Sequence, residues 1–192
     1  MYINLDENGL QPRITNCTFC NNDGRIEFAS GDGETVIGSS ITFSKCHIHD
    51  NFKGSNANIK TSLFIFGYIK SENIIIEDCI FERNGAICIY QDDQNNPKLY
   101  NTNINRCTFS NNQGPCGCCI KASSTNLYAN KIFIEDCAFN YNTVIQNDEE
   151  MEKYGCVYII HTSAEFKGVN EFNRNQNLYT GSPFSEAYES LG

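Results

Sequence analysis

Three side chains that could do chemistry together, Cys20, His49 and Glu82, lie about one repeat length apart along the chain. A thiol, an imidazole and a carboxylate are the nucleophile, the base and the orienting group of a covalent-catalysis site. With His47, the same group could instead bind a metal ion. The alternative is that an exposed position of a repeat accepts any polar residue. We favour this alternative and therefore predict no catalytic residue, no metal and no cofactor.

These candidates occupy one position of a repeat with the skeleton Ile-x-x-Cys-x-Phe-x-x-Asn. The same position holds Ser110 and Asn140 in later copies, so its chemistry varies. The marker cysteines are spaced by 29, 33, 28 and 30 residues, at Cys17, Cys46, Cys79, Cys107 and Cys137. A fixed period of about 20 to 50 residues is typical of solenoids and propellers.

Within each unit the apolar residues alternate, as at Ile74 and Ile76 or at Cys79 and Phe81. This period of two indicates strands rather than helices. Three short strands in each unit fit one coil of a parallel β-helix, whereas a propeller blade needs roughly 40 residues. We therefore predict an all-β fold, a parallel β-helix solenoid of about six coils of roughly 30 residues.

If the coils stack in register, each repeat position becomes a ladder of equivalent residues about 4.8 Å apart. Phenylalanines form an inward ladder, at Phe19, Phe81, Phe109, Phe139 and Phe172. Asparagines form a second ladder three residues later, at Asn22, Asn51, Asn84, Asn112, Asn142 and Asn175. We expect these asparagines to adopt the left-handed conformation at a corner and to bond to one another through their amides.

The position before each marker cysteine alternates in charge, reading Asn16, Lys45, Asp78, Arg106 and Asp136. In register, these residues would form an outward ladder of salt bridges. Each exposed pair contributes only about 0.2 to 1 kcal/mol. The alternation therefore supports the register more than it explains stability.

The chain has 11 cysteines, a number that would suggest disulfides in a secreted protein. The five marker cysteines, however, alternate in phase with the inward Phe, so we expect a column of small buried side chains. Because these side chains point in parallel, we predict reduced thiols rather than disulfides. Cys116, Cys118 and Cys119 are clustered without a second matching pair, which favours packing over metal binding.

The composition excludes several partners. A formal net charge of −9 argues against nucleic acid, which requires a basic face. No apolar run approaches the roughly 20 residues that cross a membrane, so we predict no membrane insertion. The first residues lack the basic start and apolar core of a signal peptide.

Phe-x-x-Asn segments alternate with small-residue segments, of which Gly85-Ala86-Ile87 is the best example. This pattern resembles the polymorphic membrane protein repeats of intracellular bacteria (Gly-Gly-Ala-Ile and Phe-x-x-Asn) and the β-helix surface proteins of protists. The resemblance covers roughly residues 12 to 175. It implies a right-handed, single-stranded β-helix with a pectin lyase-like fold and a role in adhesion or as a surface scaffold.

An alternative function is a carbohydrate-binding or carbohydrate-active β-helix, similar to pectate lyases or glycosidases. Asp92 and Asp93 resemble the paired carboxyl groups of a glycosidase, and Tyr100, Tyr128 and Tyr141 would be stacking platforms for sugars. The His-Gly and Arg-Ile-Lys segments expected after the paired aspartates are absent. We therefore interpret the Asp-Asp pair as part of a solvated turn.

The predicted organisation is an N-terminal cap at 1–13, one β-helix domain at 14–177 and a C-terminal cap or tail at 178–192. We predict a non-enzymatic scaffold that binds proteins or assembles with itself, with a glycan as the alternative ligand. We expect it at the cell surface or outside the cell. Free thiols and the missing signal peptide would instead favour an intracellular structural assembly.

Overall fold

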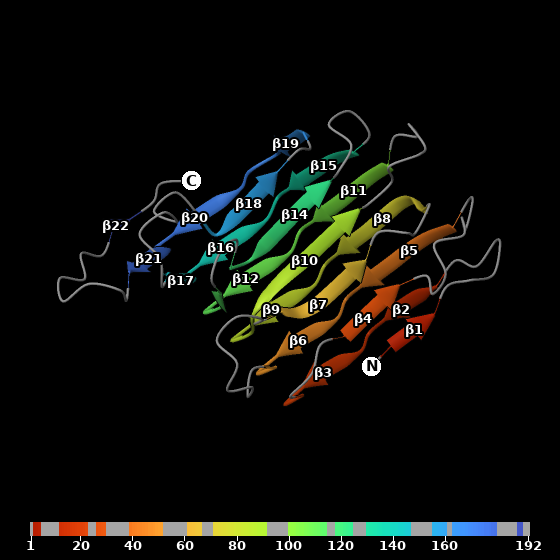
Figure 1. Ribbon diagram of the computed structural model, residues 1–192, viewed down its shortest axis with the longest axis horizontal. Helices are drawn as coiled ribbons and strands as arrows, with labels where there is room; N and C mark the ends of the chain where they lie inside the picture. The colour runs from red at the N-terminus through yellow and green to blue at the C-terminus, as the bar shows by residue number, and fades with distance from the viewer. Residues whose placement is uncertain are drawn as a thin grey trace.

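A computed structural model shows a parallel β-helix without any helix among the residues it describes. The structure describes residues 2–4, 12–22, 26–29, 39–51, 61–66, 71–91, 100–114, 118–124, 130–146, 155–160, 163–179 and 188–189. Strands run across the molecule as stacked rungs, from the N-terminus at one end to the C-terminus at the other (Figure 1). Within these residues, no helix long and apolar enough to span a membrane is found.

Two sheets of six parallel strands form two long faces. Sheet A contains β1 (Tyr2–Asn4), β4 (Ile26–Ala29), β7 (Thr61–Phe66), β10 (Ala86–Gln91), β14 (Ile120–Ser124) and β18 (Val157–Ile160). Sheet B contains β2 (Arg13–Thr15), β5 (Ser39–Ser44), β8 (Ser71–Glu77), β11 (Tyr100–Asn105), β15 (Asn130–Glu135) and β19 (Ser163–Lys167).

A third six-stranded sheet and a smaller one complete the described strands. Sheet C contains β3 (Thr18–Cys20), β6 (His47–His49), β9 (Ile80–Glu82), β12 (Thr108–Ser110), β16 (Ala138–Asn140) and β20 (Glu171–Asn173). Sheet D contains β13 (Gln113–Gly114), β17 (Thr143–Gln146), β21 (Gln176–Tyr179) and β22 (Tyr188–Glu189), which pairs antiparallel with β21.

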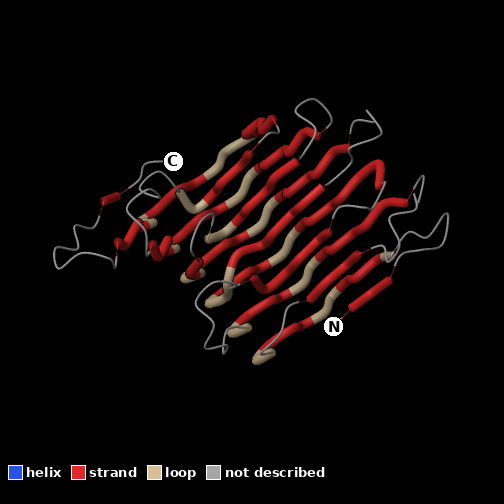
Figure 2. Tube along the Cα trace, viewed as in Figure 1, coloured by secondary structure: helices blue, strands red, loops and turns tan. Residues whose placement is uncertain are grey.

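The chain visits the sheets in a fixed order. Each strand of sheet B except β19 is followed by a two-residue corner and a strand of sheet C, and the chain then returns to sheet A. After β19, three residues lead to β20, and the next strand is β21 of sheet D. These corners follow one another along the stack (Figure 2). Later coils add a strand of sheet D between sheets C and A, which the repeat pattern did not predict. The three strands expected for each unit are therefore found in the first three described coils, whereas the next two coils have four.

The pairing register is the one that the repeat predicts. Phe19 lies opposite Ile48, which lies opposite Phe81, and the series continues to Phe172. Four of these phenylalanine rings stack face to face, with centroids 5.1, 4.9 and 4.7 Å apart from Phe81 to Phe172. Burial of these rings and of the isoleucines of sheet B provides the hydrophobic stabilisation of a thin, continuous core.

The asparagine ladder is present, with one correction to its backbone geometry. Asn112 is typical: its Oδ1 accepts the backbone N–H of Asn84 at 2.9 Å, and its Nδ2 donates to the Phe81 carbonyl at 3.0 Å and to Asn142 Oδ1 at 3.0 Å. The left-handed conformation, however, belongs to the residue before each asparagine, at Asn21, Asp50, Arg83, Asn111, Tyr141 and Arg174. The asparagine itself turns inward, because a buried amide can satisfy backbone groups of the preceding coil.

The marker cysteines make a ladder of the same design. The backbone N–H of Cys107 donates to Cys137 Sγ at 3.4 Å, and the Cys107 thiol lies 3.5 Å from the Ile76 carbonyl of the preceding coil. In the last described coil Asn170 takes this place: its Oδ1 accepts the N–H of Cys137 at 3.0 Å, and its Nδ2 donates to the Ile134 carbonyl at 3.2 Å. The marker thiols are therefore hydrogen-bonding groups as well as small core side chains.

The charge column before the marker cysteines forms only part of the predicted ladder. Arg106 makes two bonds to Asp78, at 2.7 and 3.2 Å, and these bonds lower the pKa of the Asp78 carboxyl, with a smaller contribution from Lys45. Asp136 instead accepts the backbone N–H of Val169 at 2.8 Å. Among the described residues no ion pair joins Asp136 to Arg106, whose guanidinium is bound to Asp78 and Glu77, so the predicted ladder forms only between Asp78 and Arg106.

Candidate functional site

Sheet C places the three candidate side chains next to one another. Cys20 lies opposite His49, and His49 lies opposite Glu82, each on an adjacent parallel strand. Ser110 and Asn140 continue the column on β12 and β16. The register expected from the repeat therefore holds for this column, and its side chains alternate with the inward Phe column.

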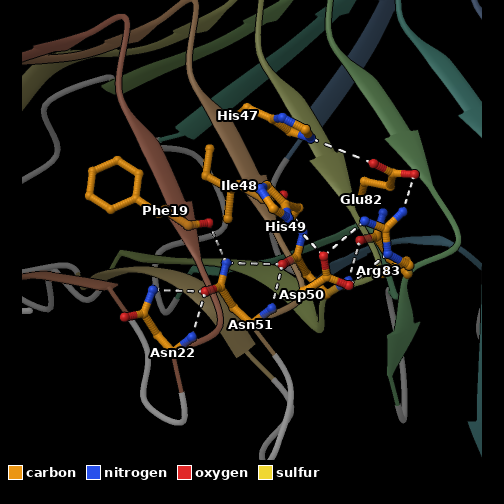
Figure 3. Close-up of polar contacts among 11 residues, drawn as sticks. Phe19, Asn22, His47, Ile48, His49, Asp50, Asn51, Glu82 and Arg83 are labelled. Carbon is orange, nitrogen blue, oxygen red and sulfur yellow. Dashed lines mark hydrogen bonds and ion pairs between the residues drawn. The ribbon is translucent and has the colours of Figure 1, made fainter.

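His47 and His49 each have an acidic neighbour (Figure 3). His49 Nδ1 lies 2.7 Å from Asp50 Oδ2, a hydrogen bond between sequence neighbours. His47 Nε2 lies 3.6 Å from Glu82 Oε2, which is too long for a hydrogen bond, and this nitrogen is buried without a hydrogen-bond partner. The two imidazole rings lie side by side, with centroids 4.3 Å apart.

Arg83 joins the two carboxylates of this cluster. Its Nε and Nη2 atoms bond to Asp50 at 2.6 and 2.8 Å, a bidentate pair across adjacent coils, and its Nη1 bonds to Glu82 (Figure 3). The hydrogen bonds from Arg83 and His49 hold the pKa of Asp50 well below its usual range, and Asp50 raises the pKa of Arg83. We name His47, His49, Asp50, Glu82 and Arg83 the sheet C polar cluster.

Sequence reasoning missed Asp50 and Arg83. A signal was present in the sequence, because both stand two residues after the inward position and carry opposite charges one coil apart. A left-handed backbone at both residues, with φ of 55° and 53°, turns their side chains outward to meet.

The arrangement does not connect a nucleophile to a base. Cys20 is exposed, and within the described part of the chain no hydrogen bond joins it to His49 or Glu82. Instead, His49 Nδ1 is bonded to Asp50, and Glu82 Oε1 is bonded to Arg83. Nor do the described residues contain a group of three His, Cys, Asp or Glu side chains that could hold a metal ion.

Of the proposed sugar-binding residues, the structure places only one fully. Tyr141 is 48% exposed at a corner, but the Arg174 guanidinium lies over its ring, 5.6 Å from the centroid. Tyr100 begins β11, and its side chain is not described. Asp92, Asp93 and Tyr128 lie outside the described residues.

A second cysteine cluster lies where the chain enters sheet A. Cys118, Cys119 and Cys156 are buried and free, and the N–H of Cys119 donates to the Cys156 carbonyl at 2.9 Å. Burial raises the pKa of the Cys119 thiol well above its usual value, as it does for Cys107 in the marker column. Such thiols are poor nucleophiles, because the thiolate is the reactive form. Cys116 lies outside the described residues.

Comparison with known proteins gives no identity. No family model, no curated protein and no solved structure matches the chain. The function must therefore be argued from the geometry, in which the polar side chains of sheet C mainly bind one another.

Proposed function

We propose that this chain is a non-enzymatic β-helix scaffold, a rigid rod whose faces and loops make contacts with other proteins. One observation carries the proposal: both carboxylates of the sheet C polar cluster, Asp50 and Glu82, are bonded to Arg83, and no described hydrogen bond joins the exposed Cys20 to a base. Side chains held in such ion pairs join adjacent coils of the fold. A catalytic site would instead leave a base or nucleophile free to meet a substrate.

The interior supports rigidity along the rod. Stacked rings from Phe81 to Phe172 and an asparagine ladder of short hydrogen bonds repeat without interruption through the described coils. In a solenoid each coil contacts only its neighbours, so such ladders are what make the rod stiff. Extended flat faces of this kind suit protein contacts, and the resemblance to surface β-helix repeats supports a role in adhesion at a cell surface.

The carbohydrate alternative has less support. A sugar stacks on an open aromatic face, and the Tyr141 ring is covered on one side by Arg174. A glycosidase needs two carboxyl groups on either side of a bond, one acting as acid. In the sheet C polar cluster Asp50 and Glu82 share one guanidinium instead, and the low pKa of Asp50 makes it a poor proton donor.

The experiment that tests the proposal combines a sugar assay with protein crosslinking. The purified chain is screened on a glycan array and for release of reducing sugars from a panel of polysaccharides, and both are expected to be negative. Crosslinking on intact cells, followed by mass spectrometry, is expected to return proteins bound to the folded chain. Phe109→Asp, which breaks the ring stack, is the unfolded control and should lose these crosslinks. Sugar release, glycan binding or an absence of protein crosslinks would overturn the scaffold proposal.

A further inference from the structure

The two ends of the β-helix expose the residues that its middle buries. In sheet B, the column of Ile76, Ile104 and Ile134 is fully buried, yet its last member, Phe166, is 49% exposed. Val169, at the corner that follows, is 72% exposed. All five residues of β19 are exposed, which is unusual for a strand whose column is otherwise core.

The N-terminal end shows the same feature. Ile14 and Phe19, on β2 and β3, are only partly buried, whereas their counterparts Phe43 and Ile48 in the next coil are buried. The strands at both ends are also edge strands: β1, β2 and β3 at one end, β18, β19 and β20 at the other. The edges lie at opposite ends of the stack (Figure 1).

The two ends match one another position by position. Following the pairing register along sheet B, the column that starts at Arg13 ends at Glu165, so opposite charges stand at its two ends. The neighbouring column starts at Ile14 and ends at Phe166. In sheet C the column of Phe19 ends at Phe172.

The strand order also continues across such a junction. If β1, β2 and β3 of one copy pair with β18, β19 and β20 of another, each of the sheets A, B and C runs on in parallel. Strand β22 pairs with the edge strand β21 of sheet D and so covers that edge at the C-terminal end. No described strand of the first coil belongs to sheet D, so β22 blocks none of the strand pairs of this junction.

We infer that this chain stacks head to tail on further copies of itself, with Glu165 and Phe166 of one copy against Arg13 and Ile14 of the next. The inference rests on the proposed scaffold function and names one of its partners, a second copy of this chain. The edge strand of a sheet is a ready template for such pairing. Because the contact joins two different surfaces of the chain, the assembly does not close into a ring. It therefore forms rods whose length increases with protein concentration.

The test is sedimentation velocity of the purified chain over a wide range of concentration. The average mass should rise continuously with concentration. Arg13→Glu and Glu165→Arg each place like charges across the junction, and each is expected to weaken association by about tenfold or more. Phe166→Arg should weaken it further. Lys131→Glu, an exposed charge reversal on β15, one strand in from the end strand β19, is the matched control and should associate like the wild type.

Mixing the two charge-reversed variants distinguishes head-to-tail stacking from other modes. Arg13→Glu chains repel one another, as do Glu165→Arg chains, but each variant presents ends that suit the other. Association should therefore return in an equimolar mixture. A chain that stays monomeric, a mass that stops at the dimer, or a mixture without recovery would overturn the inference. None of these results would change the crosslinks to other proteins, so the scaffold proposal is tested separately.

Discussion

Replacing Asn112 by alanine is expected to destabilise the fold by about 2 to 6 kcal/mol. The side chain is 1% exposed, and its Oδ1 is the acceptor for the backbone N–H of Asn84. Without it, this buried donor has no partner, which costs about 1 to 3 kcal/mol. The bonds from Nδ2 to the Phe81 carbonyl and to Asn142 Oδ1 are also lost, and each contributes about 0.5 to 1.5 kcal/mol.

The same substitution at the end of the ladder is the control. Asn22 is exposed in the first described coil, and within the described residues its side chain makes one bond, from Nδ2 to Asn51 Oδ1 at 2.8 Å. Asn22→Ala is therefore expected to cost no more than about 1.5 kcal/mol, since water replaces what is lost. Both variants are compared by urea denaturation followed by far-ultraviolet circular dichroism. Equal losses at the two positions, or no loss at Asn112, would refute the ladder as a source of stability.

Three further predictions concern the corners, the thiols and the ion pairs. At the left-handed position Asn111, substitution by valine should cost about 1 to 2 kcal/mol, whereas glycine should be tolerated, as thermal denaturation would show. A thiol reagent should label exposed Cys20 at once and buried Cys107 only after unfolding, as peptide mapping would show; rapid labelling of Cys107 in the folded chain would contradict this. The pKa of Asp50 is held down by Arg83, so the stability from this pair is present above the unfolded pKa of about 4 and is lost as pH falls through the lower, folded pKa. Carboxyl titration by nuclear magnetic resonance should show the pKa of Asp50 rising in Arg83→Gln but not in Arg106→Gln.

The register of the fold could be predicted from the sequence because each coil contributes one residue to every column. Cys20, His49 and Glu82 therefore meet on adjacent strands as the repeat indicates. The conformation of the asparagines could not be read in the same way. An asparagine can adopt the left-handed conformation or place its amide in a buried ladder of hydrogen bonds. Here the asparagines form the ladder, and the residue before each of them has the left-handed conformation.

Other features were hidden for local reasons. Strand β13 has only two residues, too few to show an alternating pattern. Asn170 stands two residues before Phe172, at the marker position, but it is not a cysteine, so a search for the marker residue does not find it. The ion pair of Asp50 and Arg83 depends on both residues turning outward at a corner, and the sequence alone does not show that geometry.

The stacked register is the central claim, and hydrogen-bond couplings between backbone amides and carbonyls test it most directly. Each bond that links one marker corner to the next coil has a donor–acceptor distance of 2.9 Å. The expected couplings join the amides of His47, Ile80, Thr108, Ala138 and Glu171 to the carbonyls of Cys17, Cys46, Cys79, Cys107 and Cys137, in that order. A complete series would establish the parallel β-helix in solution. Couplings to other carbonyls, shifted by a residue or by a coil, would contradict it.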